Sequence, residues 1–279
     1  MSAHWSEQRE GGFPLGIRLF VALALRCGRR AARAALYPIT LYFFLRRPYE
    51  RRASRAFLAR AFGRRARAGE VMRHIHAFAA TLLDRIFLLA GRFRGFDVSV
   101  HGLDALTSRM QPGRGVLLLG AHVGSFEVLR ALADGHGDVD VRAVLDTQKT
   151  PALTAALHAL NPAIASKVID ASRSGPEIAL ALHEAVHEGA LATLLGDRAR
   201  PHEASALVEF MGAPARFPVA PYLLGAALKV PVVFCLGLYR GGNRYEIHFE
   251  AFADEIVLSR RERQGELRAL AQRYAARLE

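Results

Sequence analysis

The spacing of apolar residues changes from helical to strand-like near residue 95. Residues 75–90 place apolar side chains three and four positions apart, which predicts a packed helix. Gly91 and Gly95 follow, and glycines in this position are typical of a helix end. Beyond them, short apolar runs alternate with helical patterns. We therefore expect a helical first part and, from about Gly95, one domain of alternating strands and helices.

Several short runs rich in apolar residues in the second part are typical of strands, and the continuous ones among them are typical of buried strands in a parallel sheet. These predicted strands are 98–100, 116–119, 139–145, 191–195, 230–236 and 245–249. Helical patterns between them cover 125–133, 151–160, 176–188 and 219–228. Apolar strands separated by helices indicate a parallel sheet with helices on both faces. The predicted fold class is therefore α/β, a single αβα sandwich with a largely parallel sheet.

The composition is that of a folded protein with a large core. The 279 residues are 51% hydrophobic and 23% charged, which excludes an intrinsically disordered chain. Cys27 and Cys235 are the only cysteines and lie far apart in the sequence. A disulfide scaffold and a multi-cysteine zinc module are therefore excluded as well.

Positive charge is concentrated in the first quarter of the chain. Residues 1–67 contain 15 arginines and three glutamates, a net charge of +12, which equals the net charge of the whole protein. Basic segments of this kind attract polyanions such as nucleic acid, anionic lipid headgroups or acidic proteins. No zinc-finger spacing or RNA-binding signature accompanies the arginines, so nucleic acid is not an expected partner.

Apolar runs between these arginines favour a membrane surface. Residues 15–25 are apolar except for Arg18, and residues 34–45 are uncharged and rich in aromatics. Both are shorter than the roughly 17–25 apolar residues of a spanning helix, but they suit the headgroup region of an anionic leaflet. We expect residues 1–67 (the leader) to be a basic, apolar, helical membrane-associating segment, and residues 68–279 to form the α/β domain with its leading helix. The alternative is a basic helical hairpin packed on the protein body.

A histidine and a glutamate lie just after the predicted strand 116–119. His122 follows the run VLLLGA, so it should leave the carboxyl end of a buried strand, the edge where open α/β sheets bind ligands. Gly124 allows a turn, and Ser125 is suited to cap the helix that Glu127 enters. A strand, turn and helix bring the two side chains together better than one helix, on which residues five apart point about 140° apart.

Such a pair supports general base catalysis at a carbonyl group. The neutral imidazole of His122 would take the proton from an alcohol or amine as it attacks, and the carboxylate of Glu127 would hold the tautomer and stabilise the imidazolium. Backbone N–H groups at the helix start could bind the developing oxyanion. The alternative is a histidine that satisfies a turn, with Glu127 on a solvated helix face.

A second histidine pair matches the HExxH zinc signature. His183, Glu184 and His187 would place two imidazoles and a water-activating carboxylate on one helix face. The metzincin extension is missing, and the possible substitutes Glu203 and Glu209 lie in turn-like sequence rather than on a second helix. We favour the alternative, an amphipathic surface helix whose apolar side includes Leu182 and Val186. No metal or other cofactor is therefore expected.

Two further segments concern the same part of the fold. Asp197 and Arg198 follow a predicted strand and should reach the sheet edge of His122 if the two strands are parallel. Residues 209–218 (EFMGAPARFP) are interpreted as a tight turn that runs into a helix N-terminus. A GxSxG elbow is missing from the sequence, which argues against a serine hydrolase.

Taken in order, these blocks resemble the lysophospholipid and lipid A biosynthesis acyltransferase family. The matching segments are LLLGAHVGSFE, which ends at Glu127, EGALATLLGDR, which ends at Arg198, FMGAPA, which begins at Phe210, and the run 218–231. A basic, apolar leader ahead of the domain is likewise a family trait. The resemblance spans roughly residues 5–252.

The resemblance implies direct transfer of a fatty acyl chain, without an acyl-enzyme, from an acyl carrier protein or CoA thioester to a hydroxyl or amine of a membrane lipid. It implies His122 as the base and Glu127 as its partner. The residues that it puts beside the substrate are Gly124, Ser125, Asp197 and Arg198. The implied partners are the carrier protein, a glycolipid or lipid A-like acceptor, and the anionic cytoplasmic face of a bacterial inner membrane, with peripheral or shallow insertion.

The chain departs from lipid A acyltransferases at residues that concern the acceptor. Ser125 and Phe126 stand where those enzymes usually have Asn-Trp, and Asp146 and Thr147 stand where an arginine is expected. A relative that acylates a different glycolipid fits these differences. Three functions remain open, in this order: an acyltransferase using His122, a zinc hydrolase using the HExxH motif, and a non-catalytic membrane-associated relative.

Overall fold

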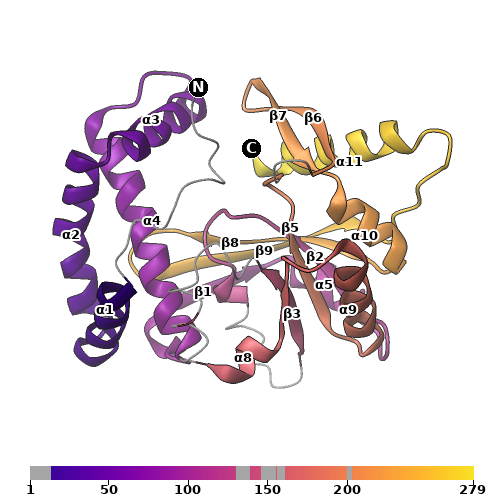
Figure 1. The fold of residues 1–279 in the computed structure, drawn as a ribbon, viewed down its shortest axis with the longest axis horizontal. Helices are drawn as coiled ribbons and strands as arrows, with labels where there is room; N and C mark the ends of the chain where they lie inside the picture. The colour runs from indigo at the N-terminus through magenta and orange to yellow at the C-terminus, as the bar shows by residue number, and fades with distance from the viewer. Residues whose placement is uncertain (1–13, 130–138, 146–154, 156–160, 200–202) are drawn as a thin grey trace.

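The centre of the protein is a seven-stranded sheet. A computed structural model describes residues 14–129, 139–145, 155, 161–199 and 203–279. The strands of the sheet are β1 (Asp97–His101), β2 (Val116–Gly120), β3 (Val141–Leu145), β4 (Val168–Asp170), β5 (Leu191–Leu195), β8 (Val232–Tyr239) and β9 (Arg244–Ala253). Their order is β1-β9-β8-β2-β5-β3-β4, and Figure 1 shows the sheet in the middle of the molecule. The last five in this order run parallel, and β1 and β9 run antiparallel to β8.

Helices cover both faces of the sheet. They are α1 (Pro14–Cys27), α2 (Arg29–Arg46), α3 (Pro48–Phe62), α4 (Ala68–Leu89), α5 (Leu103–Thr107), α8 (Pro162–Ser166), α9 (Gly175–His187), α10 (Ala220–Leu228) and α11 (Arg263–Leu278). In β2, Leu117 and Leu119 join a core with α9, α10 and α11, and Val116 and Leu118 join a second core with α4 and α5. The described chain is therefore a mixed α/β fold with a mostly parallel sheet, as the apolar runs predict.

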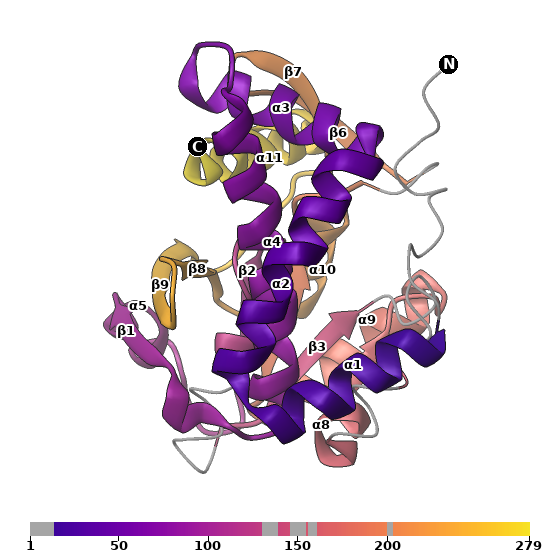
Figure 2. The ribbon, with the colours of Figure 1, turned by 90° about the vertical axis from the view of Figure 1, so that its left-hand side faces the viewer.

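The helices of the leader pack on the rest of the protein. Figure 2 shows α2 lying along α4, with α1 and α3 beside them. Ala32, Leu36 and Thr40 of α2 are buried in this contact. None of the described helices combines the length and the apolar composition that a bilayer-spanning helix requires.

Asp84 of α4 anchors the leader through a buried polar cluster. Its side chain has no exposed surface, and Arg29 of α2 makes two hydrogen bonds to it, at 2.7 and 2.8 Å. Arg33 of α2 donates to the same carboxylate at 3.2 Å, and Tyr245 of β9 donates at 2.9 Å. Two arginines of the leader therefore bind the protein body, as the hairpin alternative predicts. Contact of the leader with a membrane stays a prediction.

Most predicted elements are present, with small shifts of their ends. The six predicted strands correspond to β1, β2, β3, β5, β8 and β9, and the predicted helices 176–188 and 219–228 correspond to α9 and α10. The helix expected at 75–90 is longer and begins at Ala68. The helix expected at 151–160 lies outside the described residues, apart from residue 155. Of the helix expected at 125–133, residues 130–133 also lie outside the described part.

The turn expected within residues 209–218 is present at Met211 and Gly212, but a strand lies between this turn and the helix. The chain forms a separate antiparallel hairpin there, β6 (Ser205–Phe210) and β7 (Ala213–Pro218). Met211 and Gly212 form its two-residue loop with φ of +52° and +69°. Positive φ at both loop positions is the turn that matches the twist of paired strands. Only after β7 does the chain enter α10.

Candidate active site

β2 carries the predicted histidine to the carboxyl edge of the sheet. All five of its residues are buried, and it lies between β5 and β8. Gly120, the last residue of β2, is paired with Leu195, the last residue of β5. His122 and Asp197 each follow two residues later, so parallel pairing brings them to the same place. The expectation that both reach one edge is confirmed.

His122 and Asp197 are joined by two hydrogen bonds. Nδ1 of His122 lies 2.8 Å from Oδ1 of Asp197, and the backbone N–H of His122 donates to Oδ2 at 3.1 Å. Because an ionised carboxylate only accepts hydrogen bonds, Nδ1 carries the proton. Nε2 of the neutral ring is then the basic nitrogen. The side chain of His122 is 39% exposed, so a substrate can reach the ring from solvent.

Asp197 is ionised at neutral pH. Burial raises the pKa of its carboxyl, but the hydrogen bonds from His122 and the electrostatic interactions with His122 and Arg198 together lower it more. The pKa therefore lies below the ordinary value of an aspartate. A carboxylate in this state holds the imidazole in one tautomer and stabilises the imidazolium that forms when Nε2 takes a proton.

Two glycines hold the turn after β2 against β8. Gly124 has a φ of +75°, and a Cβ at this position would collide with the carbonyl oxygen of Gly237. The backbone N–H of Ser125 donates to that same oxygen at 2.7 Å. A Cβ at Gly237 would in turn collide with the carbonyl of Ser125. The chain can therefore place His122 and Glu127 on either side of this turn only with glycine at both positions.

The carboxylate of Glu127 is buried and contacts Arg85 and Ser125. Oε1 lies 2.5 Å from Nε of Arg85 on α4, and the hydroxyl of Ser125 donates to Oε2 at 3.2 Å. The contact with Arg85 is an ion pair outside hydrogen-bond geometry, since its Nε–H has no hydrogen-bond acceptor among the described residues. Where the sequence suggests Glu127 as the partner of His122, the structure gives Asp197. The catalytic role of Glu127 stays a prediction.

His122 is hydrogen-bonded to Asp197 rather than to Glu127 because the two carboxylates reach this edge of the sheet in different ways. Asp197 arrives on a neighbouring parallel strand with its side chain toward His122, whereas Glu127 enters the next helix beyond the glycine turn. Arg85 is a contributor that sequence reasoning missed. Its signal is the adjacent charges of Asp84 and Arg85 inside the apolar run of α4, which indicate buried polar contacts without naming their partners.

The other residues predicted beside the substrate lie around this pair. Ser125 is buried, and its hydroxyl is used by Glu127 rather than as a helix cap. Arg198 is exposed next to Asp197 and contributes positive charge to it. Substrate binding by Gly124, Ser125, Asp197 and Arg198 stays a prediction.

The HExxH motif lies on an exposed face of α9. Leu182, Ala185 and Val186 are buried, whereas the side chains of the motif point to solvent. Nδ1 of His187 bonds to the carbonyl of His183 at 2.9 Å. Among the described residues, no third acidic, histidine or cysteine ligand comes close enough to join the two histidines. This arrangement favours the amphipathic surface helix.

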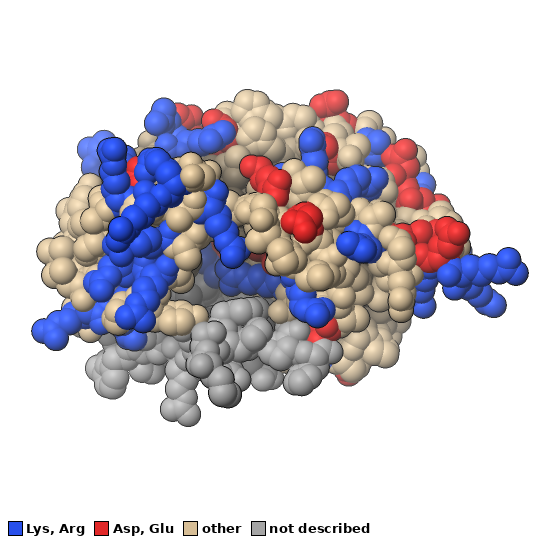
Figure 3. Space-filling view, turned by 90° about the horizontal axis from the view of Figure 1, so that it is seen from above, with Lys and Arg blue, Asp and Glu red and all other residues tan. Residues whose placement is uncertain are grey.

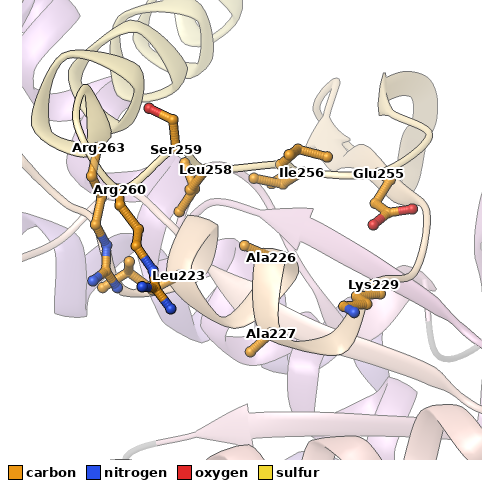
Figure 4. A pocket seen from close by; sticks show the side chains of 11 residues that line it. Leu223, Ala226, Ala227, Lys229, Glu255, Ile256, Leu258, Ser259, Arg260 and Arg263 are labelled. Atoms are coloured by element: carbon orange, nitrogen blue, oxygen red, sulfur yellow. The ribbon is translucent and has the colours of Figure 1, made fainter.

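A surface pocket of about 450 Å³ lies elsewhere, between α10 and the segment before α11. Figure 4 shows Arg260 and Arg263 at one end of it and Lys229 and Glu255 at the other, with Ile256 between them. None of the predicted site residues lines this pocket. It is therefore separate from the His122–Asp197 pair.

Comparison with known families adds a finding that covers almost the whole chain. A family model described as bacterial lipid A biosynthesis acyltransferase matches residues 4–278. No curated protein matches the chain. The matched span includes the leader from residue 4, both strands that lead to the His122–Asp197 pair, and α11.

Proposed function

The chain belongs to the bacterial lipid A biosynthesis acyltransferase family, and from this premise we propose that it transfers a fatty acyl chain from a thioester to a hydroxyl or amine of a membrane glycolipid. The observation that carries the proposal is the hydrogen bond between His122 and Asp197 at the carboxyl edge of the parallel sheet. An imidazole oriented by an ionised carboxylate is the group needed to activate an alcohol or amine for attack on a carbonyl.

The proposed reaction is a direct transfer through one tetrahedral intermediate. Nε2 of His122 takes the proton of the acceptor hydroxyl or amine while its oxygen or nitrogen attacks the thioester carbonyl. Backbone N–H groups where the chain enters the helix at Glu127 stabilise the oxyanion. The C–S bond then breaks, and the leaving thiolate receives the proton from His122. The products are the acylated lipid and the free thiol of the donor, and no acyl-enzyme forms.

Asp197 and Glu127 have different roles in this proposal. Asp197 orients His122 and stabilises its imidazolium, because it is the carboxylate bonded to Nδ1. Glu127 acts as a positioning residue for the turn that carries His122, because its carboxylate joins Ser125 within the turn to Arg85 on α4. The sequence instead predicts that Glu127 is the carboxylate that partners His122. Activity of variants at Asp197 and Glu127 can distinguish these two assignments.

The surface of the leader supports a site of action at a membrane. Of the sixteen large apolar side chains that are exposed in the described part of the chain, nine lie in the leader, between Leu19 and Phe62. Figure 3 shows Lys and Arg side chains gathered over the part of the molecule where α2 and α3 lie. Exposed apolar groups beside cations suit the headgroup region of an anionic leaflet, here proposed as the cytoplasmic face of the bacterial inner membrane.

The proposed donor is acyl carrier protein or acyl-CoA. Both donors are anionic, so the same basic surface that attracts the leaflet would attract them. The proposed acceptor is a glycolipid or a lipid A-like molecule, and the replacement of Asn-Trp by Ser125 and Phe126 allows an acceptor other than lipid A.

The experiment is an acyl-transfer assay. The donor is acyl carrier protein or CoA that carries a radiolabelled acyl chain, and the acceptor is extracted bacterial membrane lipid. The wild type should label a lipid, and His122→Ala should lose about 10²-fold or more of this activity. Asp197→Asn should lose a similar factor because the tautomer of His122 is no longer fixed. His183→Ala is the matched control, since it removes an exposed histidine from α9, and it should keep full activity.

The outcomes separate the alternatives. If Glu127→Gln loses as much activity as Asp197→Asn, Glu127 partners His122 during the reaction, as the sequence suggests. Equal loss in His183→Ala would move the chemistry to the HExxH histidines. Binding of lipid and carrier protein by the wild type, without label transfer from either donor, would instead support the non-catalytic relative and contradict the proposal.

A further inference from the structure

His101, Glu246 and His248 form a cluster on one face of the sheet that the proposed reaction does not use. β1 and β9 are parallel neighbours, and their register pairs His101 directly with His248. Glu246 lies two residues before His248 and so projects from the same face of β9. One ligand atom from each side chain lies within 4.8 Å of the other two, and the two imidazole rings are stacked 4.7 Å apart.

The cluster is open to solvent although the strands that carry it are not. Tyr245 and Ile247, the neighbours of Glu246 on β9, are fully buried on the opposite face of the sheet. The side chains of His248 and Glu246 are 40% and 29% exposed, and His101 is exposed at the edge strand. An ion can therefore enter the cluster from solvent without opening the core.

We propose that these three side chains bind a divalent transition-metal ion, and zinc in particular. Two imidazole nitrogens and one carboxylate oxygen are ligands that Zn²⁺ accepts, and water can complete the tetrahedron. Mg²⁺ and Ca²⁺ prefer sets of oxygen ligands, so two histidines select against them. The proposal does not rest on the acyl-transfer function, and β8 separates β9 from the strand that leads to His122.

Arg240 competes with a metal ion for Glu246. Its Nε and Nη2 both lie 2.7 Å from Oε2, the oxygen that Nε2 of His248 also approaches at 3.2 Å. The guanidinium therefore occupies the carboxylate oxygen that faces His248. The guanidinium contributes positive charge that repels a cation, so its removal should tighten metal binding. This competition distinguishes a site at the cluster from adventitious binding elsewhere.

The test is calorimetric titration of the untagged full-length protein with ZnCl₂ and, in parallel, with MgCl₂. We expect one zinc ion per chain at this site and no heat from magnesium. His248→Ala and His101→Ala should each weaken zinc binding by at least about tenfold, the loss typical of removing even a supporting residue of a metal site. Arg240→Gln should tighten it by up to about fivefold, the strength of an exposed ion pair.

His187→Ala is the control, because His183 and His187 offer a second exposed imidazole pair. If His101, Glu246 and His248 bind the zinc ion, His187→Ala keeps the zinc site that His248→Ala loses. Zinc binding that persists in both His101→Ala and His248→Ala, or that disappears only in His187→Ala, would overturn the proposal. Since His101 and His248 lie on different strands, failure of one variant to fold still leaves the other to decide, with circular dichroism as the check on folding.

Discussion

At the residue scale, Gly124 is the position on which the geometry of the site depends most directly. Its positive φ is unfavourable for a residue with a side chain, and a Cβ would also collide with the carbonyl of Gly237. His122, two residues earlier, does not have a positive φ. The glycine of the motif is therefore required by the contact between the turn and β8, in addition to any role toward a substrate.

Gly124→Ala should destabilise the protein by more than about 2 kcal/mol, because the new Cβ meets backbone that cannot move aside. Gly241→Ala is the matched control. Gly241 also has a positive φ, +90°, but a Cβ there meets nothing within 4 Å, so only the conformational cost of about 1 kcal/mol applies. Urea denaturation of both variants gives the comparison. Equal losses would show that the contact with Gly237 is unimportant.

The two cysteines should differ sharply in reactivity. Burial raises the pKa of the Cys235 thiol to about 12, so it stays protonated at pH 8, whereas Cys27 is exposed. Because the thiolate is the reactive form, a thiol reagent should modify one cysteine in the native protein and two after denaturation. Cys27→Ser should leave no fast-reacting thiol. Rapid native labelling of this variant would contradict the burial of Cys235.

At the scale of elements, the buried Asp84 joins three of them by its side chain alone. It binds arginines from α2 and a tyrosine from β9 while lying on α4. Removing one partner of a buried ion pair leaves the others without compensation, which costs about 3–5 kcal/mol. The contact between leader and domain therefore depends on this carboxylate.

Asp84→Asn should lower the free energy of unfolding by about 3 kcal/mol or more and expose the leader to protease. Chemical denaturation measures the first effect and limited proteolysis the second. Asp254→Asn is the control, since Asp254 is 84% exposed in its pair with Arg109, and it should change stability by less than about 0.5 kcal/mol. Similar proteolysis of wild type and Asp84→Asn would contradict the anchoring role.

The elements that the sequence predicts well are those with a strong local signal. β2 and β5 are continuous apolar runs, and their parallel pairing brings His122 and Asp197 to one edge of the sheet, as expected, although the sequence does not predict the hydrogen bond between them. β4, with three residues, is too short for a periodic pattern. β7 contains Pro214 and Pro218, which are typical of turns but are tolerated at the edge of a two-stranded hairpin. The contact of Arg85 with Glu127 depends on how α4 packs, and spacing carries no information about it.

At the scale of the whole molecule, exposed apolar side chains collect on the leader in an ordered way. Tyr37, Leu41 and Leu45 are 62%, 45% and 61% exposed and recur every four residues along α2. This spacing makes one stripe along the helix, beside the face that is buried against α4, and at the start of the stripe Tyr37 also stacks on His76 of α4. A stripe of this kind can enter the boundary between headgroups and acyl chains while the arginines remain among the headgroups.

Replacing Tyr37, Leu41 and Leu45 together by serine should weaken binding to vesicles that contain anionic lipid by at least about tenfold. Co-sedimentation with such vesicles, and with neutral ones for comparison, gives the measurement. Leu180→Ser with Val257→Ser is the control, because these side chains are 60% and 78% exposed outside the leader. If both variants bind vesicles like the wild type, the stripe does not contact the membrane.

The adjacency of Asp84 and Arg85 has a practical consequence for anyone who wishes to shorten the chain. A truncation that begins at residue 68 would keep α4 but remove both arginines that neutralise Asp84, and would uncover apolar side chains that α2 now covers. The next residue, Arg85, contacts Glu127. A displacement of α4 at Asp84 would therefore also disturb the turn that carries His122. A more soluble variant should therefore be sought by changing exposed residues of the leader rather than by deleting it.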